Sequence, residues 1–318
     1  MGVQCNPLPF STQVLTLSLP LSARMATILN GKAVGAALRQ KLAVEVQSLS
    51  QSLNKRPCLA TVQVGRRPDS DTYLRLKGEA AIEAGIDVDE RKLPADATTD
   101  QLRDCISELN DKKGFNGILV QLPLPAHIDT RLAVQTISPL LDVDAIHPVN
   151  IGLLNMRHGA PLFAPCTPLG IMELLRHAGV RIAGKHAVVI GRSDIVGHPI
   201  AQLLLEQDAT ITVCHHRTEN IAQVVKQGDI VIAACGKQEM VRGDWIKPGA
   251  AVIDVGINSV PDPKRKIGYR LVGDVNFNEA VKVAGCITPV PGGVGPMTIA
   301  MLLSNVVTGF KRSENIKF

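Results

Sequence analysis

Tyr73 and Lys77 are two side chains whose types and spacing suit acid–base chemistry. They stand four residues apart in an expected helix and therefore share one helical face. Tyrosine is scarce, with only two in the chain. A phenol and an amine that point the same way could orient and protonate a small substrate. The alternative is an amphipathic helix whose lysine stem covers apolar surface, and spacing alone favours this alternative.

These two residues follow an expected strand. The apolar run 58–64 predicts the strand, which leads through a Pro-containing turn into a helix expected over 70–85. Gln121 lies in a second apolar run, 117–125, which ends in two prolines. Ligands of parallel sheets bind beyond the carboxyl ends of the strands. We therefore expect Gln121 to converge with the helical face that carries Tyr73 and Lys77.

Strands and helices alternate along the first half of the chain. The expected elements are 33–53, 58–64, 70–85, 88–93, about 98–112 and 117–125. This alternation predicts a parallel α/β sheet. The segment 142–148 is expected to be irregular, and we place the domain change in 145–165. A further helix is expected to open with Thr167 as its cap and Pro168 at its first position.

The second half shows a doubly wound, Rossmann-like pattern. A strand at 185–190, a glycine turn at 191–199 and a helix at 200–206 are followed by strands expected at 209–214, 229–234, 250–255 and 286–290. We therefore predict an α/β protein with two α/β domains and a cleft between them. The last apolar segment, 296–310, is expected to form a helix that returns to the first domain.

The glycine turn is a candidate nucleotide site. It departs from G-x-G-x-x-G, because Ser193 stands at the second glycine position and Val196 at the third. Its context is nevertheless the required one, with a strand before it, a helix after it and a second strand at the right distance. The N-terminus of that helix would offer free N–H groups to a phosphate. A plain strand–helix turn is the alternative, and the context favours the nucleotide site.

The end of the strand at 209–214 indicates which nucleotide binds. An NAD site usually has an acidic residue there for the ribose 2′-hydroxyl, but this chain continues with His215, His216 and Arg217. Arg192 lies in the glycine turn itself. Two guanidinium groups and His216 could accept a 2′-phosphate, so we expect NADP in preference to NAD.

The segment 289–298 contains three prolines and three glycines and follows the end of an expected strand. Glycines let backbone N–H groups approach a ligand closely. A simple connection to the last helix would not need this composition, so we favour a binding loop.

Composition excludes several classes of function. The chain has 318 residues, which suits two domains. Its hydrophobic content of 45% with 20% charged residues is typical of soluble globular proteins. The net charge of +5 is mild and aromatics make up only 3%, so nucleic-acid binding is not indicated. No apolar run is long enough for a membrane span, no set of metal ligands is apparent, and no G-x-S-x-G elbow suggests a serine hydrolase.

Cysteine usage and the N-terminus bear on the compartment. Seven cysteines, an odd number without C-x-x-C spacing, predict reduced thiols inside the cell. Residues 1–24 contain no acidic residue and three prolines. We expect an unstructured extension that is at most a weak mitochondrial address. The location, cytoplasmic or mitochondrial, is left open.

Taken together, the segments resemble the bifunctional methylenetetrahydrofolate dehydrogenase/cyclohydrolase family. They occur in the family's order and extend over nearly all of residues 26–312. One departure is Ala145, where the family usually has glycine. The matching segments are V-G-x-x-P-x-S-x-x-Y-x-x-x-K (64–77), V-Q-L-P-L-P (120–125), D-V-D (142–144), H-P-x-N-x-G-x-L (147–154), P-C-T-P-x-G (165–170), G-R-S-x-I-V-G-x-P (191–199), D-V-G-I-N (254–258), V-G-D-V (272–275) and P-V-P-G-G-V-G-P-M-T (289–298).

The resemblance implies two reactions at one site. NADP takes a hydride from 5,10-methylenetetrahydrofolate, and water then hydrolyses the methenyl product to 10-formyltetrahydrofolate. Lys77 would be the general acid/base of hydrolysis, Gln121 its partner, Tyr73 a stacking residue and Asp144 the residue that holds the pterin ring. Further folate contacts are implied at Val120, Leu122, Pro291, Gly292, Gly293, Val294 and Gly295. The nucleotide site would include Gly191, Arg192, Ser193, His216 and Ile257.

The resemblance also implies a homodimer, and because no set of metal ligands is apparent we expect no metal. We expect residues 25–150 with 296–318 to form the folate-binding catalytic domain, and residues 151–295 the NADP-binding domain. A charged lysine amine is a poor base at neutral pH. We expect the charge of Lys77 to be disfavoured by a position early in its helix and by a neighbouring methenyl cation.

Two alternative functions are compatible with these residues. One is a dehydrogenase without the hydrolytic step, and the other is a non-catalytic nucleotide-binding protein. The intact set of Tyr73, Lys77, Gln121 and Asp144 argues against both, because a degenerate site would be the sign of either.

Overall fold

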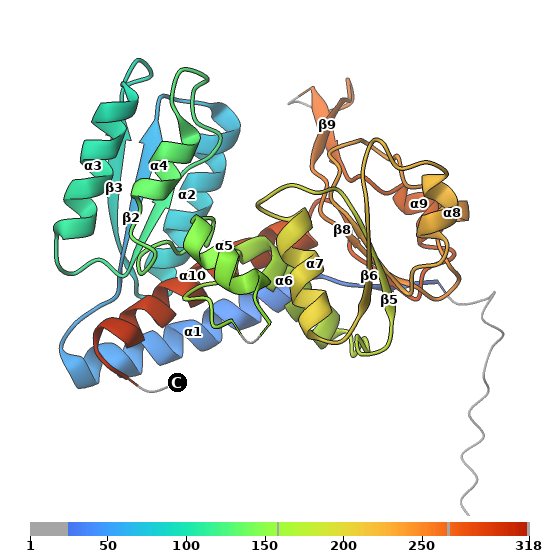
Figure 1. The fold of residues 1–318 in the computed structure, drawn as a ribbon, viewed down its shortest axis with the longest axis horizontal. Coiled ribbons are helices and arrows are strands. Elements are labelled where there is room, and N and C mark those ends of the chain that lie inside the picture. The colour runs from blue at the N-terminus through green and yellow to red at the C-terminus, as the bar shows by residue number, and fades with distance from the viewer. Residues whose placement is uncertain (1–24, 158, 266–267, 317–318) are drawn as a thin grey trace, which may run out of the picture.

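Two α/β units stand side by side, with long helices running beneath the first of them (Figure 1). The computed structural model describes residues 25–157, 159–265 and 268–316, without the side chains of residues 68–70. The expectation for residues 1–24 lies outside the described residues. No helix of the described chain is both long and apolar enough to cross a membrane.

The first unit is built on a three-stranded parallel sheet in the order β3-β2-β4. Central strand β2 is apolar and almost wholly buried. Helix α3 presents one apolar face to the sheet, and Thr98 and Gln101 form a capping box at its start. The expected parallel sheet is confirmed. The bounds are β2 Cys58–Val64, α2 Pro68–Glu83, β3 Asp87–Leu93, α3 Thr99–Asp111, β4 Gly117–Val120 and α4 Thr130–Thr136.

The second unit is a six-stranded sheet in the order β1-β11-β8-β7-β5-β6, in which every pair is parallel. After β5 the chain places β6 on one side and β7 on the other, so the topological switch point lies between β5 and β7. The expected doubly wound sheet is confirmed. The strands are β1 Thr27–Ile28, β5 His186–Ile190, β6 Thr210–Cys214, β7 Ile230–Ala233, β8 Ala251–Asp254 and β11 Cys286–Ile287.

Several short elements of the second half are absent from the sequence-based expectations. An antiparallel hairpin, β9 Asn258–Pro261 with β10 Tyr269–Val272, projects from the carboxyl end of β8. The remaining helices are α5 Pro148–Asn155, α6 Cys166–His177, α7 Gly197–Glu206, α8 Ile221–Val225, the short 3₁₀ helix η2 Gly243–Trp245 and α9 Phe277–Ala280.

Two long helices connect the units. Helix α1 (Gly31–Leu53) begins after β1, with Asn30 as its side-chain cap. Helix α10 (Val294–Ser313) packs against both α1 and α6 and reaches β2 and β4 of the first unit. Its buried residues Leu303 and Val306 share a core with Leu59. The expected return of the last helix to the first domain is therefore confirmed.

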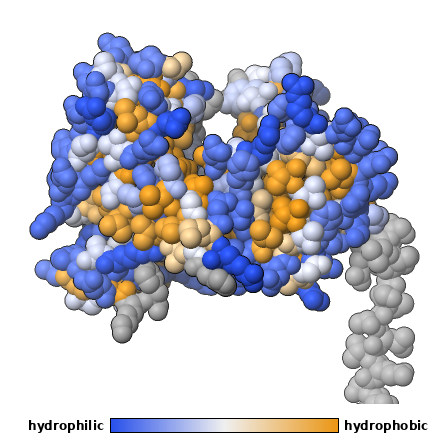
Figure 2. Space-filling model, in the orientation of Figure 1, coloured by the Kyte–Doolittle hydropathy of each residue, from blue (hydrophilic) through white to orange (hydrophobic). Residues whose placement is uncertain are grey.

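The surface is notched between the two units. Figure 2 shows apolar residues on both sides of the notch, on the face drawn there. The carboxyl ends of β2 and β4 in one unit, and of β8 and β11 in the other, lead into the loops that carry the candidate site.

Candidate active site

Lys77 is buried, with 5% of its surface exposed. Its Nζ donates to Oε1 of Gln121 at 3.3 Å and lies 4.9 Å from the centroid of the Tyr73 ring. The structure therefore excludes the solvent-facing helix that spacing alone favoured. It also contradicts the expected help from the helix dipole: α2 begins at Pro68, so Lys77 lies well beyond the first turn, where that effect acts.

Gln121 is fixed by the end of β4. Its backbone N–H donates to the carbonyl of Val62 at 2.9 Å, and its Nε2 donates to the carbonyl of Leu122 at 2.6 Å. These contacts direct Oε1 toward the Lys77 amine. The side chain of Val120 is buried in the core, so only its backbone is available to a ligand, whereas Leu122 is half-buried.

Asp144 lies in a loop that a buried neighbour organises. The carboxylate of Asp142 accepts hydrogen bonds from the His147 N–H at 2.8 Å and from Nδ2 of Asn150 at 2.9 Å. Ala145 has a φ of 57°, in the left-handed region that costs an L-residue roughly 1 kcal/mol or more. This explains why glycine is usual at that position. The loop nevertheless brings Asp144 close enough to influence Tyr73.

Burial raises the pKa of the Tyr73 phenol above its ordinary value, and the nearby Asp144 charge adds to the rise. A hydrogen bond with Thr298 acts in the opposite direction. Tyr73, Lys77, Gln121 and Asp144 thus converge from α2, the end of β4 and the loop before α5. A neutral phenol beside a lysine amine can stack on a flat ligand while the amine exchanges protons.

A buried polar layer behind these residues escaped the sequence analysis. Sγ of Cys166 donates to the Val143 carbonyl at 3.3 Å, and Nδ2 of Asn305 donates to the same carbonyl at 2.8 Å. Burial, and after it the Asp144 charge, raises the pKa of the Cys166 thiol. The only sequence signal was the P-C-T-P segment, which we had interpreted as the start of a helix and not as part of the site.

Thr167 does not have the expected capping role. Helix α6 begins at Cys166, and the preceding residue, Pro165, makes no side-chain cap. The Thr167 hydroxyl instead lies 2.9 Å from the Thr298 hydroxyl on α10. The prediction was wrong because a tertiary partner on another helix competes for this side chain.

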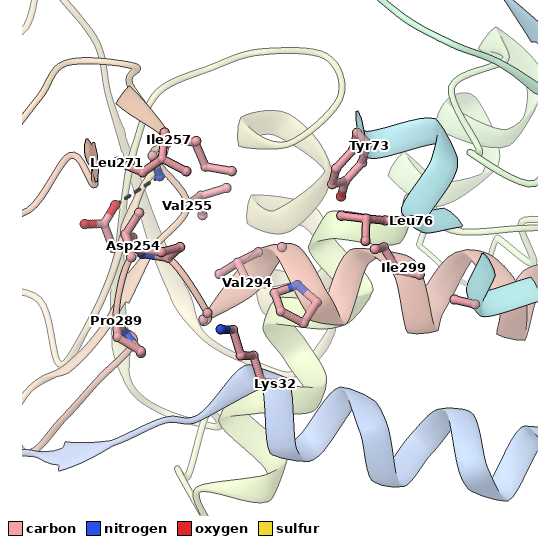
Figure 3. A pocket seen from close by; sticks show the side chains of 18 of the residues that line it. Lys32, Tyr73, Leu76, Asp254, Val255, Ile257, Leu271, Pro289, Val294 and Ile299 are labelled. Carbon is pink, nitrogen blue, oxygen red and sulfur yellow. Dashed lines mark hydrogen bonds between the residues drawn. The ribbon is translucent and has the colours of Figure 1, made fainter. Parts of the chain in front are cut away.

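A cavity of about 530 Å³ opens between the two units beside Tyr73. Figure 3 shows Tyr73 and Leu76 of α2 on one side and Val255, Ile257 and Leu271 on the other, with Lys32 of α1 below. The Pro289–Pro296 segment also lines it. Lys77, Gln121 and Asp144 are not part of this lining, but Lys77 contacts the ring of Tyr73, which is. The cavity thus brings the expected folate loop together with Tyr73 and Ile257.

The loop 291–295 is held by the first turn of α1. The Lys32 N–H donates to the Gly292 carbonyl at 3.1 Å. A Cβ on Gly31 would lie 1.7 Å from the Gly293 carbonyl oxygen, so only glycine allows this approach. Helix α10 begins at Val294, two residues before the expected Pro296. The end of the expected binding loop is therefore the first turn of a helix.

The glycine turn requires glycine for steric reasons. Gly191 has a φ of 119°, and a Cβ there would lie 2.0 Å from the Ala234 carbonyl oxygen. Oγ of Ser193 accepts a hydrogen bond from the Gly197 N–H at 3.3 Å. Helix α7 begins at Gly197, not at Ile200. The N–H groups of its first turn are not free as expected, because those of Gly197 and His198 donate to Ser193 and that of Ile200 donates to the Val196 carbonyl. The close backbone approach at Gly191 is the feature of the turn that suits a pyrophosphate.

Basic side chains flank that turn. Arg192 follows β5, and His216 and Arg217 follow β6, the parallel neighbour of β5. All three are exposed, and neither arginine has an ion pair with any residue that the structure describes. Ile257, 62% exposed, lies at the cavity across from Tyr73. The described residues contain no group of His, Cys, Asp and Glu that could hold a metal ion.

Two family models match the chain. The catalytic domain of tetrahydrofolate dehydrogenase/cyclohydrolase matches residues 29–144, and the NAD(P)-binding domain of the same family matches residues 165–314. Bifunctional protein FolD 2 of Arabidopsis thaliana is 53% identical over 92% of this chain and 97% of its own length. Bifunctional protein FolD of Erythrobacter litoralis is 49% identical over 92% and 97%.

Solved structures agree with these matches. The methylenetetrahydrofolate dehydrogenase-cyclohydrolase of Trypanosoma brucei, complexed with NADP and an inhibitor, superposes with a TM-score of 0.89 at 48% identity, over 92% of this chain and 99% of that chain. The corresponding enzyme of Campylobacter jejuni gives a TM-score of 0.84 at 43% identity, over 90% and 99%.

Proposed function

The chain belongs to the tetrahydrofolate dehydrogenase/cyclohydrolase family, and on this premise we propose that it catalyses two successive reactions of one-carbon metabolism. It oxidises 5,10-methylenetetrahydrofolate to the 5,10-methenyl compound with NADP. It then hydrolyses the methenyl compound to 10-formyltetrahydrofolate. The observation that carries both steps is the buried Lys77–Gln121–Tyr73 group beside a cavity lined by both units.

Lys77 is the general acid/base of the hydrolysis. Its amine takes one proton from the water whose oxygen adds to the methenyl carbon, and it returns that proton to the ring nitrogen as the carbon–nitrogen bond breaks. The second proton of the water leaves to solvent as the C=O bond of the formyl group forms. Gln121 holds the amine in place through the 3.3 Å hydrogen bond. Tyr73 stacks on the folate, and Asp144 accepts hydrogen bonds from the pterin ring. Val120, Leu122 and the loop 291–295 complete the folate wall.

The cofactor half of the cleft suits NADP. The glycine turn with Gly191 and Ser193 leaves room for the pyrophosphate at the start of α7. Arg192, His216 and Arg217 supply donors for a 2′-phosphate. Ile257 offers its exposed apolar side chain to the ring system of the cofactor. When bound, NADP accepts the hydride; the residues of the chain hold and orient the two reactants.

The two competing functions are less well supported. A dehydrogenase without hydrolysis would have no use for a buried lysine held by a glutamine, yet Lys77 and Gln121 are paired here. A non-catalytic nucleotide-binding protein would not need the polar group around Tyr73. Both arguments rest on a site in which no position except Ala145 is degenerate.

The folate-binding domain comprises residues 25–150 with 296–318, and the NADP-binding domain residues 151–295. This division is supported by the separate sheets and by the packing of α10 against β2 and β4. Strand β1 is a crossing element, because it joins the sheet of the second unit. The protein acts as a homodimer, as the family resemblance suggests, and light scattering at several concentrations tests this.

The compartment is intracellular, in the cytoplasm or in mitochondria. Relatives that match this chain include proteins named chloroplastic, mitochondrial and cytoplasmic. The reduced cysteines support this, since none of the six described thiols is in a disulfide. Imaging of the full chain fused to a fluorescent protein distinguishes the compartments.

A spectrophotometric assay tests the function. When the protein is mixed with methylenetetrahydrofolate and NADP, the absorbance should rise as NADPH forms. Acid-stable methenyl compound should not accumulate if hydrolysis follows. Comparing NAD with NADP in the same assay tests the cofactor preference. Accumulation of the methenyl compound with no hydrolysis would support the monofunctional alternative, and no NADPH formation would contradict the dehydrogenase step.

A further inference from the structure

Two buried carboxylates, Asp254 and Asp274, lie outside the residues assigned to either reaction. Asp254 ends β8 and is 3% exposed, and Asp274 follows β10 and is 0% exposed. Burying an ionisable group is costly unless its hydrogen bonds are satisfied. Their position at the carboxyl edge of the six-stranded sheet, where dinucleotides bind, calls for a functional explanation.

Asp254 connects β8 to the end of the hairpin. Its Oδ1 accepts hydrogen bonds from the N–H groups of Gly256 at 3.0 Å and of Asp274 at 2.9 Å, and its Oδ2 accepts one from Val275 at 2.9 Å. Its own N–H donates to the hydroxyl of Thr288 in the segment after β11, at 2.7 Å. Asp254 thereby shapes the turn that presents Ile257 to the cavity (Figure 3).

Asp274 connects the hairpin to the switch point. Its Oδ2 accepts hydrogen bonds from the N–H groups of Cys235 at 2.7 Å and Gly236 at 2.9 Å, and its Oδ1 accepts one from Nδ2 of Asn258 at 2.9 Å. Cys235 and Gly236 follow β7, which borders β5 across the switch point. The backbone just before them packs on Gly191, the first residue of the glycine turn.

Two glycines are needed for this arrangement. A Cβ on Gly273 would lie 1.8 Å from Oδ2 of Asp254, and a Cβ on Gly256 would lie 2.3 Å from Oδ1 of Asp274. The D-V-G and V-G-D segments are therefore complementary in shape. Each supplies the carboxylate that fills the space left by the glycine of the other.

No cation neutralises the pair among the residues that the structure describes, since no ion pair involves either carboxylate. Backbone N–H groups and one amide are the donors instead. Burial, with the Asp274 charge as a lesser contribution, raises the pKa of Asp254 to about 7. The two side chains are therefore held by backbone and amide donors and not by charge pairing.

We propose that Asp254 and Asp274 are positioning residues for NADP, which hold the loops after β7 and β8 in the shape that the cofactor half of the cleft requires. The inference rests on the proposed function, because it takes NADP as the ligand at the switch point. It predicts that damage to the pair weakens cofactor binding while the Lys77 site, built on the other sheet, keeps its hydrolytic activity.

Asp254→Asn is the first test. An asparagine has one acceptor oxygen, so it can serve the Gly256 and Asp274 N–H groups only by turning its NH₂ toward the Val275 N–H, where two donors clash. We expect the Kd for NADP, measured by titration calorimetry, and the KM for NADP to rise about tenfold or more, equivalent to roughly 1.4 kcal/mol. Hydrolysis of methenyltetrahydrofolate without NADP should change less than about twofold.

Asp274 offers a conservative variant that separates positioning from charge. In Asp274→Asn the side-chain oxygen can still accept the hydrogen bonds from the N–H groups of Cys235 and Gly236. The new NH₂ group then faces Asn258, whose amide can flip so that its oxygen accepts a hydrogen bond from it. We expect Asp274→Asn to bind NADP with nearly the wild-type Kd. In Asp274→Ala the Kd for NADP should rise about as much as in Asp254→Asn. The control is Asp229→Asn, at the opposite edge of the same sheet, where Asp229 pairs with Lys247.

The outcomes are distinct. If Asp254→Asn folds but its Kd for NADP is unchanged, or if both activities fall together, the pair is structural only and the inference is wrong. If Asp254→Asn fails to fold, Asn258→Ala removes a single donor from Asp274 and should still raise the Kd severalfold; an unchanged Kd there would overturn the inference. Wild-type protein that binds NADP but has neither activity would contradict the proposed function alone.

Discussion

Among the individual residues of the site, Lys77 with its buried amine constrains the mechanism most. A lysine loses most of its hydration at 5% exposure, and here the amide oxygen of Gln121 and the ring of Tyr73 take the place of water. A cation beside an aromatic ring in a desolvated site gains about 2 kcal/mol or more. Among the residues that the structure describes, no carboxylate forms an ion pair with this amine, which is held by Gln121 beside the Tyr73 ring.

Lys77→Met should separate the two reactions. Methionine keeps the length and packing of the stem but cannot exchange protons, so cyclohydrolase activity should fall about 10²- to 10⁴-fold. Hydride transfer needs no proton acceptor, and NADPH formation should fall far less. Initial rates of both reactions, with Lys92→Met as an exposed control, check this. Equal loss of both activities and of folate binding would identify a structural lysine instead.

Arg217 should determine the cofactor preference. In Arg217→Glu a carboxylate replaces a guanidinium at the end of β6, which repels a 2′-phosphate and can accept a hydrogen bond from a 2′-hydroxyl. The ratio of kcat/KM for NADP to that for NAD should fall about tenfold or more, an effect of roughly 1.4 kcal/mol. Arg181→Glu, exposed shortly before β5, is the control. An unchanged ratio would remove Arg217 from the phosphate site.

At the scale of elements, strong patterns predicted the fold and weak ones were missed. Strand β2 has the predicted bounds because every residue but its first is buried. The hairpin β9–β10 was missed because most of its residues are half-buried or exposed, and they give no apolar period. Helix α5 was missed because its eight residues are too few for a helical period, and its start is set by His147.

The candidate site was predictable where it depends on strand ends. Tyr73, Lys77 and Gln121 were expected to meet because their positions follow parallel neighbouring strands, and they do meet. Asn305 was not predictable, since its partner Val143 is 162 residues away and buried amides have no local signature. The same holds for the contact of Asp254 with Val275, because these residues are 21 positions apart and meet only when the loop after β8 and the end of the hairpin lie together.

The contact of α1 with the loop 291–295 gives a test at this scale. In Gly31→Ala the new methyl group would meet the Gly293 carbonyl oxygen, which should lower the free energy of unfolding by about 1–3 kcal/mol. Displacing this loop should also raise the KM for folate. The control is Gly152→Ala on α5, where a methyl has open space and should stabilise by roughly 0.5–1 kcal/mol. Urea unfolding and steady-state kinetics measure both; a wild-type KM in Gly31→Ala would show that the loop does not bind folate.

Across the whole molecule, the cleft depends on elements that cross between the units. Strand β1 belongs to the sheet of the second unit, yet it leads directly into α1. Helix α10 starts at the cleft and ends under the first sheet, where Phe310 is buried. Because these crossings join the two sheets, the folate wall and the cofactor wall share their supports. We therefore expect the two units to unfold together in one transition, so that a destabilising change in either sheet shifts this single transition.

The raised pKa of Asp254 should be visible in how the free energy of unfolding depends on pH. Because its pKa is raised from 3.8 to about 7 in the folded protein, the folded state binds a proton more tightly than the unfolded chain. Its contribution to stability is therefore full below about pH 4 and is lost as the pH rises through 7, at up to roughly 1.4 kcal/mol per pH unit. Asp254→Asn does not titrate, so wild-type stability should fall relative to this variant between pH 5 and 8.

Asp229 is the matched control for this measurement, because its pKa shifts the other way. A hydrogen bond from Lys247 lowers the pKa of Asp229, so its contribution is present above the unfolded value and is lost only as the pH falls below about 4. Asp229→Asn should thus shift the stability curve by a constant amount between pH 5 and 8. Urea unfolding of the three proteins at each pH distinguishes the two cases. Parallel curves for wild type and Asp254→Asn would mean that Asp254 is already ionised throughout this range, held so by its three N–H donors.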